Sequence, residues 1–244
     1  MNEPLLVLAA FLTAALSGVA GLGGGTILIG LFYAAGLPPV QAVPLFAAVQ
    51  FVSNTTRTAA YVRHVEWRAA GWFLLAAVPS TFLVAPWVAG VNEYLVMLLL
   101  AGLILASLAP GQAGQAVLPA RPAYLAAGLL NGTLGMFVGA TGLFIGRLFL
   151  RPEWRRQTTI GTLALTQMLG HGLRVLAFGW VGFSAFAQPL LLAALCAAVI
   201  LGTGAGKWLN TRIDERQFAG LFRFILVVLS LKLIWDAVKG LEWI

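Results

Sequence analysis

Two triplets of polar residues recur with the same spacing inside apolar stretches of the sequence. They are Gln50, Asn54 and Arg57 in the first half, and Gln167, His171 and Arg174 in the second. Residues at positions i, i+4 and i+7 share one stripe of a helix, so each triplet predicts one polar helix face. Polar groups inside an apolar helix tend to face a cavity or one another. The recurrence therefore favours a shared polar site with one triplet on each side.

Each of these residues also admits a simpler interpretation. Gln50 and Asn54 are of the kind that hold neighbouring helices together through hydrogen bonds. Arg57 and Arg174 each lie near the end of an apolar segment, from which an arginine can extend to a polar interface. His171 suits proton transfer because imidazole titrates near neutral pH, but a structural role fits it equally well. With one such histidine and no cysteine or carboxylate nearby, no metal site is expected.

The acidic residues are confined to loops and to the ends of apolar segments. All eight are Glu3, Glu66, Glu93, Glu153, Asp214, Glu215, Asp236 and Glu242. No carboxylate is therefore expected at mid-depth to hold a cation or to relay protons, whereas each polar triplet contains an arginine. This distribution of charge predicts an anionic substrate.

A glycine-rich stretch, SGVAGLGGGTILIG at 17–30, stands inside the first apolar segment. Each glycine costs a helix roughly 1 kcal/mol relative to alanine, so a broken helix is expected here. A break at membrane depth requires other protein or a cavity to satisfy the backbone, and an inward half-helix N-terminus offers N–H donors to an anion. The backbone and hydroxyl donors assigned to the site are Gly23, Gly24, Gly25, Thr26 and Thr141. The alternatives are close helix packing through small residues and threonines that bond their own helices.

The composition places the chain among polytopic membrane proteins. Hydrophobic residues make up 60% of its 244 residues, charged residues make up 9%, and the mean hydropathy is +0.92. The apolar segments lie at 4–33, 40–62, 69–89, 92–109, 122–150, 157–179, 183–209 and 217–238. The net charge of +7 is assigned to basic cytoplasmic loops and not to nucleic-acid binding. Because no GxxxxGK[ST] or HExxH motif is present, neither ATP hydrolysis nor zinc-dependent proteolysis is expected.

The charges of the loops predict the topology. Basic residues follow the second, fifth and seventh segments: Arg63 and Arg68; Arg147, Arg151, Arg155 and Arg156; Lys207, Arg212 and Arg216. If all eight segments crossed, these loops would lie on opposite sides, against the positive-inside rule. If the first and fifth segments fold back as re-entrant hairpins, all three basic loops become cytoplasmic and both termini lie outside, in the periplasm.

The two halves of the sequence match each other. Besides the polar triplets, Ser17-Gly18-x-x-Gly21 matches Asn131-Gly132-x-x-Gly135. The expected fold is an all-α polytopic membrane protein with two inverted repeats, each a broken, re-entrant helical hairpin followed by three transmembrane helices. The repeats are placed at 1–109 and 122–244, with a linker at 110–121. Inverted repeats around a midplane site are a common plan of secondary transporters.

The pattern LSGVAGLGGGTILIG, followed by a Pro/Ala-rich helix with a polar centre and repeated in the second half, resembles the TauE/SafE family over residues 5–239. This family is also called the sulfite exporter or toluene-sulfonate uptake permease family. The resemblance implies a bacterial inner-membrane transporter of sulfur-containing organic anions, sulfite or small carboxylates. One departure is at 135–142, GMFVGATG, where the triple glycine is missing, so Met136 and Phe137 would offer an apolar wall instead.

The function expected from the sequence is transport of a small organosulfonate, such as a taurine-like or sulfoacetate-like compound, or of sulfite, by alternating access. The rival functions are an anion-selective channel, a carboxylate transporter and a membrane scaffold without transport. No enzyme activity and no cofactor are expected. The expected partners are the small anionic substrate and the lipid bilayer, without nucleic acid, and a homo-oligomer is compatible with the sequence.

Overall fold

The protein is all-helical. The computed structural model describes residues 3–20, 23–109, 116, 118–210 and 215–241, and every regular element in these ranges is a helix. This confirms the all-α class that the apolar segments predict.

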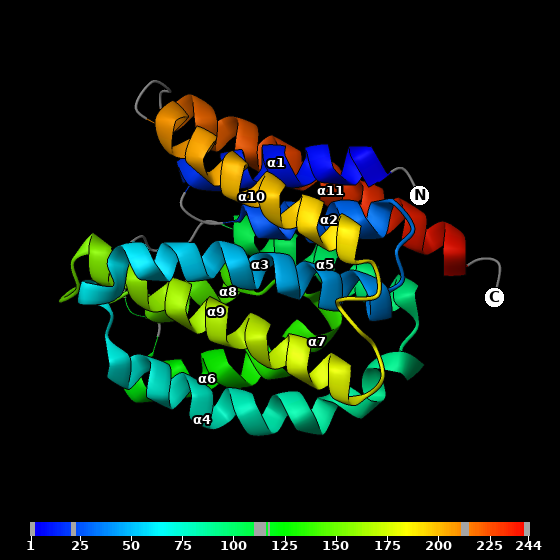
Figure 1. Cartoon of the computed structure of the whole chain (residues 1–244). Helices are drawn as coiled ribbons and strands as arrows, with labels where there is room; N and C mark the ends of the chain where they lie inside the picture. The colour runs from blue at the N-terminus through cyan, green and yellow to red at the C-terminus, as the bar shows by residue number, and fades with distance from the viewer. Residues whose placement is uncertain (1–2, 21–22, 110–115, 117, 211–214, 242–244) are drawn as a thin grey trace.

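The helices follow one another along the chain as shown in Figure 1. Up to residue 109 they are α1 (Glu3–Ala20), α2 (Gly24–Ala34), α3 (Pro39–Tyr61), η1 (Val62–His64), α4 (Trp67–Val84), η2 (Ala85–Gly90) and α5 (Glu93–Leu108). From residue 120 they are α6 (Ala120–Gly132), α7 (Leu134–Val138), α8 (Gly142–Ile145), η3 (Gly146–Phe149), α9 (Arg156–Trp180), α10 (Pro189–Asn210) and α11 (Glu215–Leu241).

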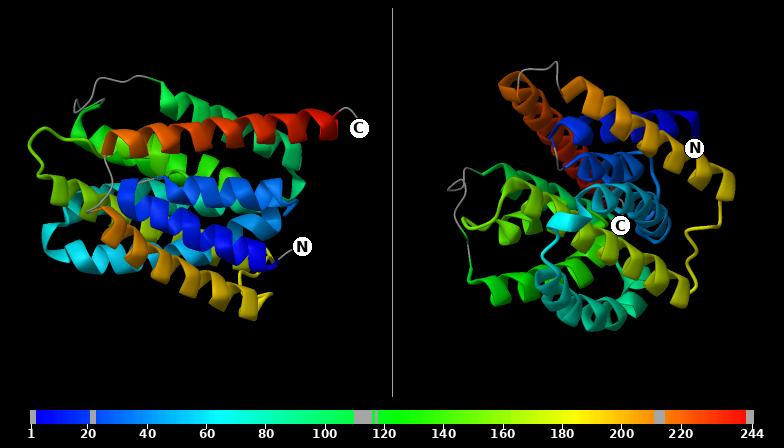
Figure 2. Two further views of the ribbon diagram at one scale, coloured as in Figure 1. Left: turned by 90° about the horizontal axis from the view of Figure 1, so that it is seen from above. Right: turned by 60° about the vertical axis from the view of Figure 1, so that its left-hand side comes forward.

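The first and fifth apolar segments are both broken into shorter helices. Helix α2 starts directly after Gly23, which has φ 98°, and runs back alongside α1 (Figure 2). Between α7 and α8 the chain turns at Gly139, with φ 77°. Only glycine adopts such positive φ values without strain, so these two residues determine where each segment can turn.

Helices from the two halves of the chain pack against each other in pairs. Helix α1 packs along α10, α4 along α6, α3 along α9, and α5 along α11. Figure 1 shows α3 and α9 side by side through the middle of the molecule. Ile29, Phe46, Met136 and Phe178 belong to one apolar core, so the two halves share their interior.

The connections lie at two opposite ends of the bundle. The connection that follows α3 and the one that precedes α9, with their arginines, lie at the left in Figure 1. The α2–α3 and α9–α10 connections, which contain no Lys or Arg, lie at the right. The chain enters α1 and leaves α11 at the same end as these two connections.

Large apolar side chains cover much of the outer surface. Exposed examples on α4, α10 and α11 are Leu75, Leu83, Leu190, Leu201, Phe224 and Leu231. Within the described residues, two stretches are long and apolar enough to cross a membrane by length and composition, Trp67–Gly90 and Pro189–Gly206. Such a surface suits contact with lipid and not with water.

The α4–α6 pair depends on a glycine. A Cβ atom at Gly128 would overlap Phe73 O and approach Ala77 N to 3.0 Å. Because backbone atoms cannot move aside locally, we expect Gly128→Ala to destabilise the protein by about 1–3 kcal/mol, as in other overpacked interiors. The measurement is the thermal unfolding midpoint of the purified protein in detergent. Gly102→Ala, which meets no atom within 4 Å, is the control and should unfold no earlier than the wild type.

Candidate functional site

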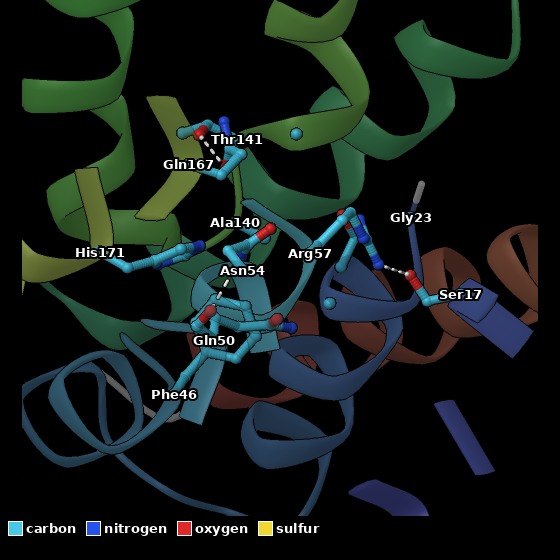
Figure 3. A pocket seen from close by; sticks show the side chains of 13 residues that line it. Ser17, Gly23, Phe46, Gln50, Asn54, Arg57, Ala140, Thr141, Gln167 and His171 are labelled. Carbon is cyan, nitrogen blue, oxygen red and sulfur yellow. Dashed lines mark hydrogen bonds between the residues drawn. The ribbon is translucent and has the colours of Figure 1, made fainter. Parts of the chain in front are cut away.

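Helices α3 and α9 bring most residues of the two polar triplets to one cavity. Helix α3 begins at Pro39, where the missing N–H of proline costs nothing, and continues without a break past the first triplet. Helix α9 packs against α3 and carries the second triplet. Between them lies a cavity of about 50 Å³ (Figure 3). Five of the six residues of the two triplets therefore line one cavity.

Most residues assigned to the site from sequence line this cavity. They are Gly23, Gly25, Thr26, Gln50, Asn54, Arg57, Thr141, Gln167 and His171. Residues at the starts of α2 and α8 also line it, so the glycine-rich stretch does face the polar triplets.

Two of the assigned residues lie behind the cavity wall. Gly24 faces α1, where a Cβ atom would overlap Thr13 O and meet Ser17 Cβ at 2.5 Å. Arg174 is completely buried and does not line the cavity. The two arginines thus have the same place in their triplets but different surroundings.

Arg57 brings a positive charge to the cavity. Its Nη2 donates to Ser17 Oγ at 3.5 Å, and Figure 3 shows the guanidinium extending past the cavity toward α1. No carboxylate lines the cavity. In the described part of the chain, the salt bridge found is between Lys232 and Asp236 on α11. An anion in the cavity would therefore meet a cation and no acidic side chain.

The first turn of α2 contributes backbone donors. Gly25 and Thr26 line the cavity, and the amides of Thr26 and Ile27 both donate to Gly23 O. The N–H group of Gly25, at the start of the 11-residue helix, has no carbonyl partner within it. The positive end of the helix dipole adds to the charge of Arg57.

Gln167 lines the cavity and has a side-chain donor without a partner. Its Oε1 accepts from Thr141 Oγ1 at 3.4 Å, whereas its Nε2 is buried and has no hydrogen-bond partner among the described atoms. A buried donor without a partner costs about 1–3 kcal/mol, so a bound oxygen acceptor would remove that cost.

Arg174 is held by Asn131, which the sequence analysis did not assign to the site. Arg174 Nη2 donates to Asn131 Oδ1 at 3.0 Å and to Asn131 O at 3.2 Å. Asn131 Nδ2 in turn donates to Thr141 Oγ1 at 2.9 Å. In the repeat Asn131 matches Ser17, which contacts the matching arginine, Arg57, so the two positions have corresponding partners. Phe46, Ala140 and Gly142 also line the cavity without a polar signal that could have marked them.

The cavity does not offer a metal site. Within the described ranges, no three His, Cys, Asp or Glu side chains lie close enough together to hold a metal ion. The arrangement instead suits hydrogen bonding to an anion.

Gly25 keeps room for Gln50. A Cβ atom on Gly25 would overlap Gln50 Nε2 and lie 3.2 Å from Cδ. We expect Gly25→Ala to displace the Gln50 amide and to weaken anion binding about tenfold. Loss of one hydrogen bond costs about 1.4 kcal/mol, which is a factor of ten in affinity. Titration of the purified protein with sulfite, an anion expected from the family resemblance, measures this. Gly71→Ala on α4, with open space around it, should bind as the wild type does.

Comparison with known proteins gives a family. The family model described as Sulfite exporter TauE/SafE matches residues 6–233, nearly the whole chain. The chain belongs to the TauE/SafE family. Comparison with the curated proteins and with the solved structures gives no match. Membership confirms the resemblance drawn from the glycine-rich stretch. The family consists of transporters and not of enzymes, so this chain is a membrane transporter of the sulfite exporter type.

Proposed function

We propose that the cavity between α3 and α9 is the substrate site of this TauE/SafE transporter and that it binds a small sulfur oxoanion. One observation carries the proposal: the cavity is lined by Arg57, by Gln167 and by the first turn of α2, and by no carboxylate. Positive charge and N–H donors without competing acidic groups suit an anionic oxygen.

The size of the cavity favours sulfite over larger organosulfonates. A cavity needs about 10–15 Å³ of volume to hold one water molecule. The cavity, at about 50 Å³, holds roughly three to five groups of that size. Sulfite, with four non-hydrogen atoms, is of this size, whereas the tail of a taurine-like or sulfoacetate-like compound would extend beyond this space.

Transport is proposed to occur by alternating access of two inverted repeats, 1–109 and 122–244, joined by the linker 110–121. The pattern of helix contacts supports this. The contact of α1 with α10 has its counterpart in that of α6 with α4, and the contact of α2 with α11 has its counterpart in that of α8 with α5. In many transporters such repeats rock around a fixed central site.

The proposed orientation puts the arginine-bearing connections in the bacterial cytoplasm and both termini in the periplasm. It is supported by the return of α2 toward the end where the chain begins, and by the opposite placement of basic and uncharged connections (Figure 1). In this orientation α1–α2 and α6–α8 are re-entrant hairpins and the positive-inside rule is obeyed.

Flux measurements with the purified protein in proteoliposomes test the proposal. We expect uptake of radiolabelled sulfite that saturates with concentration and is accelerated by unlabelled sulfite on the opposite side. Flux that does not saturate and shows no such acceleration would indicate a channel. Uptake no greater than in protein-free liposomes would contradict sulfite transport.

A further inference from the structure

Arg174 is a buried cation that does not touch the cavity, yet two chains of hydrogen bonds lead from it to the cavity wall. One leads directly to His171 on the same helix. The other passes through Asn131 and Thr141 to Gln167. We propose that Arg174 is a positioning residue that orients His171 and Gln167 so that both present N–H donors to the bound anion. This rests on the proposed function of the cavity as an anion site.

The first chain determines the tautomer of His171. Arg174 Nη1 lies 3.0 Å from His171 Nδ1. A guanidinium group can only donate, so Nδ1 must be the acceptor and therefore has no proton. In the neutral imidazole the proton is then on Nε2. Figure 3 shows the ring of His171 extending toward the centre of the cavity, where this N–H acts as a donor.

The second chain determines the orientation of the Gln167 amide. Arg174 donates to Asn131 Oδ1, so the other end of that amide, Nδ2, is directed to Thr141 Oγ1. The Thr141 hydroxyl accepts this bond and has its own proton left to donate, to Gln167 Oε1. The Nε2 group of Gln167 is then the end without a protein partner.

Two glycines make room for this arrangement. A Cβ atom at Gly135 would overlap Arg174 Nη2, and one at Gly170 would overlap Asn131 Oδ1. Both side chains are nearly or completely buried, so neither can turn toward solvent. The consequence is specificity: a wall of N–H donors favours a fully ionised oxoanion, which only accepts, over a ligand that itself carries a proton to donate.

Two variants of Thr141 separate positioning from packing. Thr141→Val keeps the shape of the side chain but removes the hydroxyl, and Thr141→Ser keeps the hydroxyl but changes the shape. We expect Thr141→Val to weaken sulfite binding about tenfold and Thr141→Ser to bind within about twofold of the wild type. The reverse order would show that Thr141 acts through packing and would overturn the proposal. Thr13→Val, at a buried threonine that bonds only its own helix, is the matched control.

The tautomer of His171 can be measured without any ligand. The sequence has two histidines, so the variant His64→Gln labelled with ¹⁵N-histidine gives the signals of His171 alone. Solid-state NMR of this protein in lipid bilayers should show a protonated Nε2 and an unprotonated Nδ1. A protonated Nδ1 would overturn the role of Arg174 even if sulfite binds. Conversely, absence of sulfite binding by the wild type would overturn the proposed function and leave the tautomer result standing.

Discussion

Replacement of Arg57 by glutamine is expected to reduce sulfite affinity by roughly 100-fold and to abolish measurable uptake at low micromolar sulfite. Arg57 is the arginine that lines the cavity. Hydrogen bonds to a charged group are worth about 1.5–3 kcal/mol, and 1.4 kcal/mol is a factor of ten in affinity. Arg57→Lys keeps the charge but loses the planar guanidinium group. Its sulfite affinity should therefore lie between those of Arg57→Gln and the wild type.

Binding titration and proteoliposome uptake measure this effect. Arg63→Gln is the matched control because Arg63 is exposed on η1 and does not line the cavity. It should bind and transport as the wild type does. Equal affinities for Arg57→Gln and the wild type would remove Arg57 from the site.

Gln167→Glu is expected to abolish sulfite binding while leaving the protein at least as stable as the wild type. The change removes the amide donor and places a carboxylate in a cavity that contains Arg57. The new carboxylate supplies the counter-charge that the substrate otherwise provides, and it repels the substrate in surroundings of low dielectric constant. The variant thus mimics a permanently occupied site.

The measurements for Gln167→Glu are the thermal unfolding midpoint and the sulfite titration. Gln157→Glu, on the exposed first turn of the same helix, introduces the same charge outside the cavity and should leave binding unchanged. A variant at position 167 that is folded and binds sulfite normally would show that Gln167 does not contact the anion.

The polar triplets were predictable from sequence because their chemistry depends on helix periodicity alone. Gln50, Asn54, Gln167 and His171 stand at the spacing that places them on one face, and α3 and α9 are continuous helices, so the expected faces exist. The break at Gly23 was predictable for a similar reason, since a run of glycines interrupts any helix.

The different places of the two arginines were not predictable from their shared spacing. Arg57 meets Ser17, whose short side chain reaches it only at 3.5 Å, and Arg57 stays at the cavity. Arg174 meets the longer Asn131 and is locked behind the cavity wall. Which residue lies opposite an arginine depends on the register between helices distant in sequence, which a single sequence does not specify.

The structural roles of the glycines in the second half were equally difficult to predict from sequence. Gly135 and Gly139 look alike in sequence, but Gly139 provides the turn, whereas Gly135 lies in α7 and leaves room for Arg174. A glycine required for a positive φ and one required for close approach differ only in their three-dimensional surroundings.

The structure of the protein with bound selenite tests the central claim most directly. Selenite is the selenium analogue of sulfite, and anomalous scattering locates the selenium atom without reference to the protein. The predicted result is one selenium site in the cavity, within hydrogen-bonding reach, through its oxygens, of Arg57, Gln167 Nε2 and the first turn of α2. Selenium bound elsewhere, with the cavity between α3 and α9 free of it, would contradict the assignment of this cavity as the substrate site.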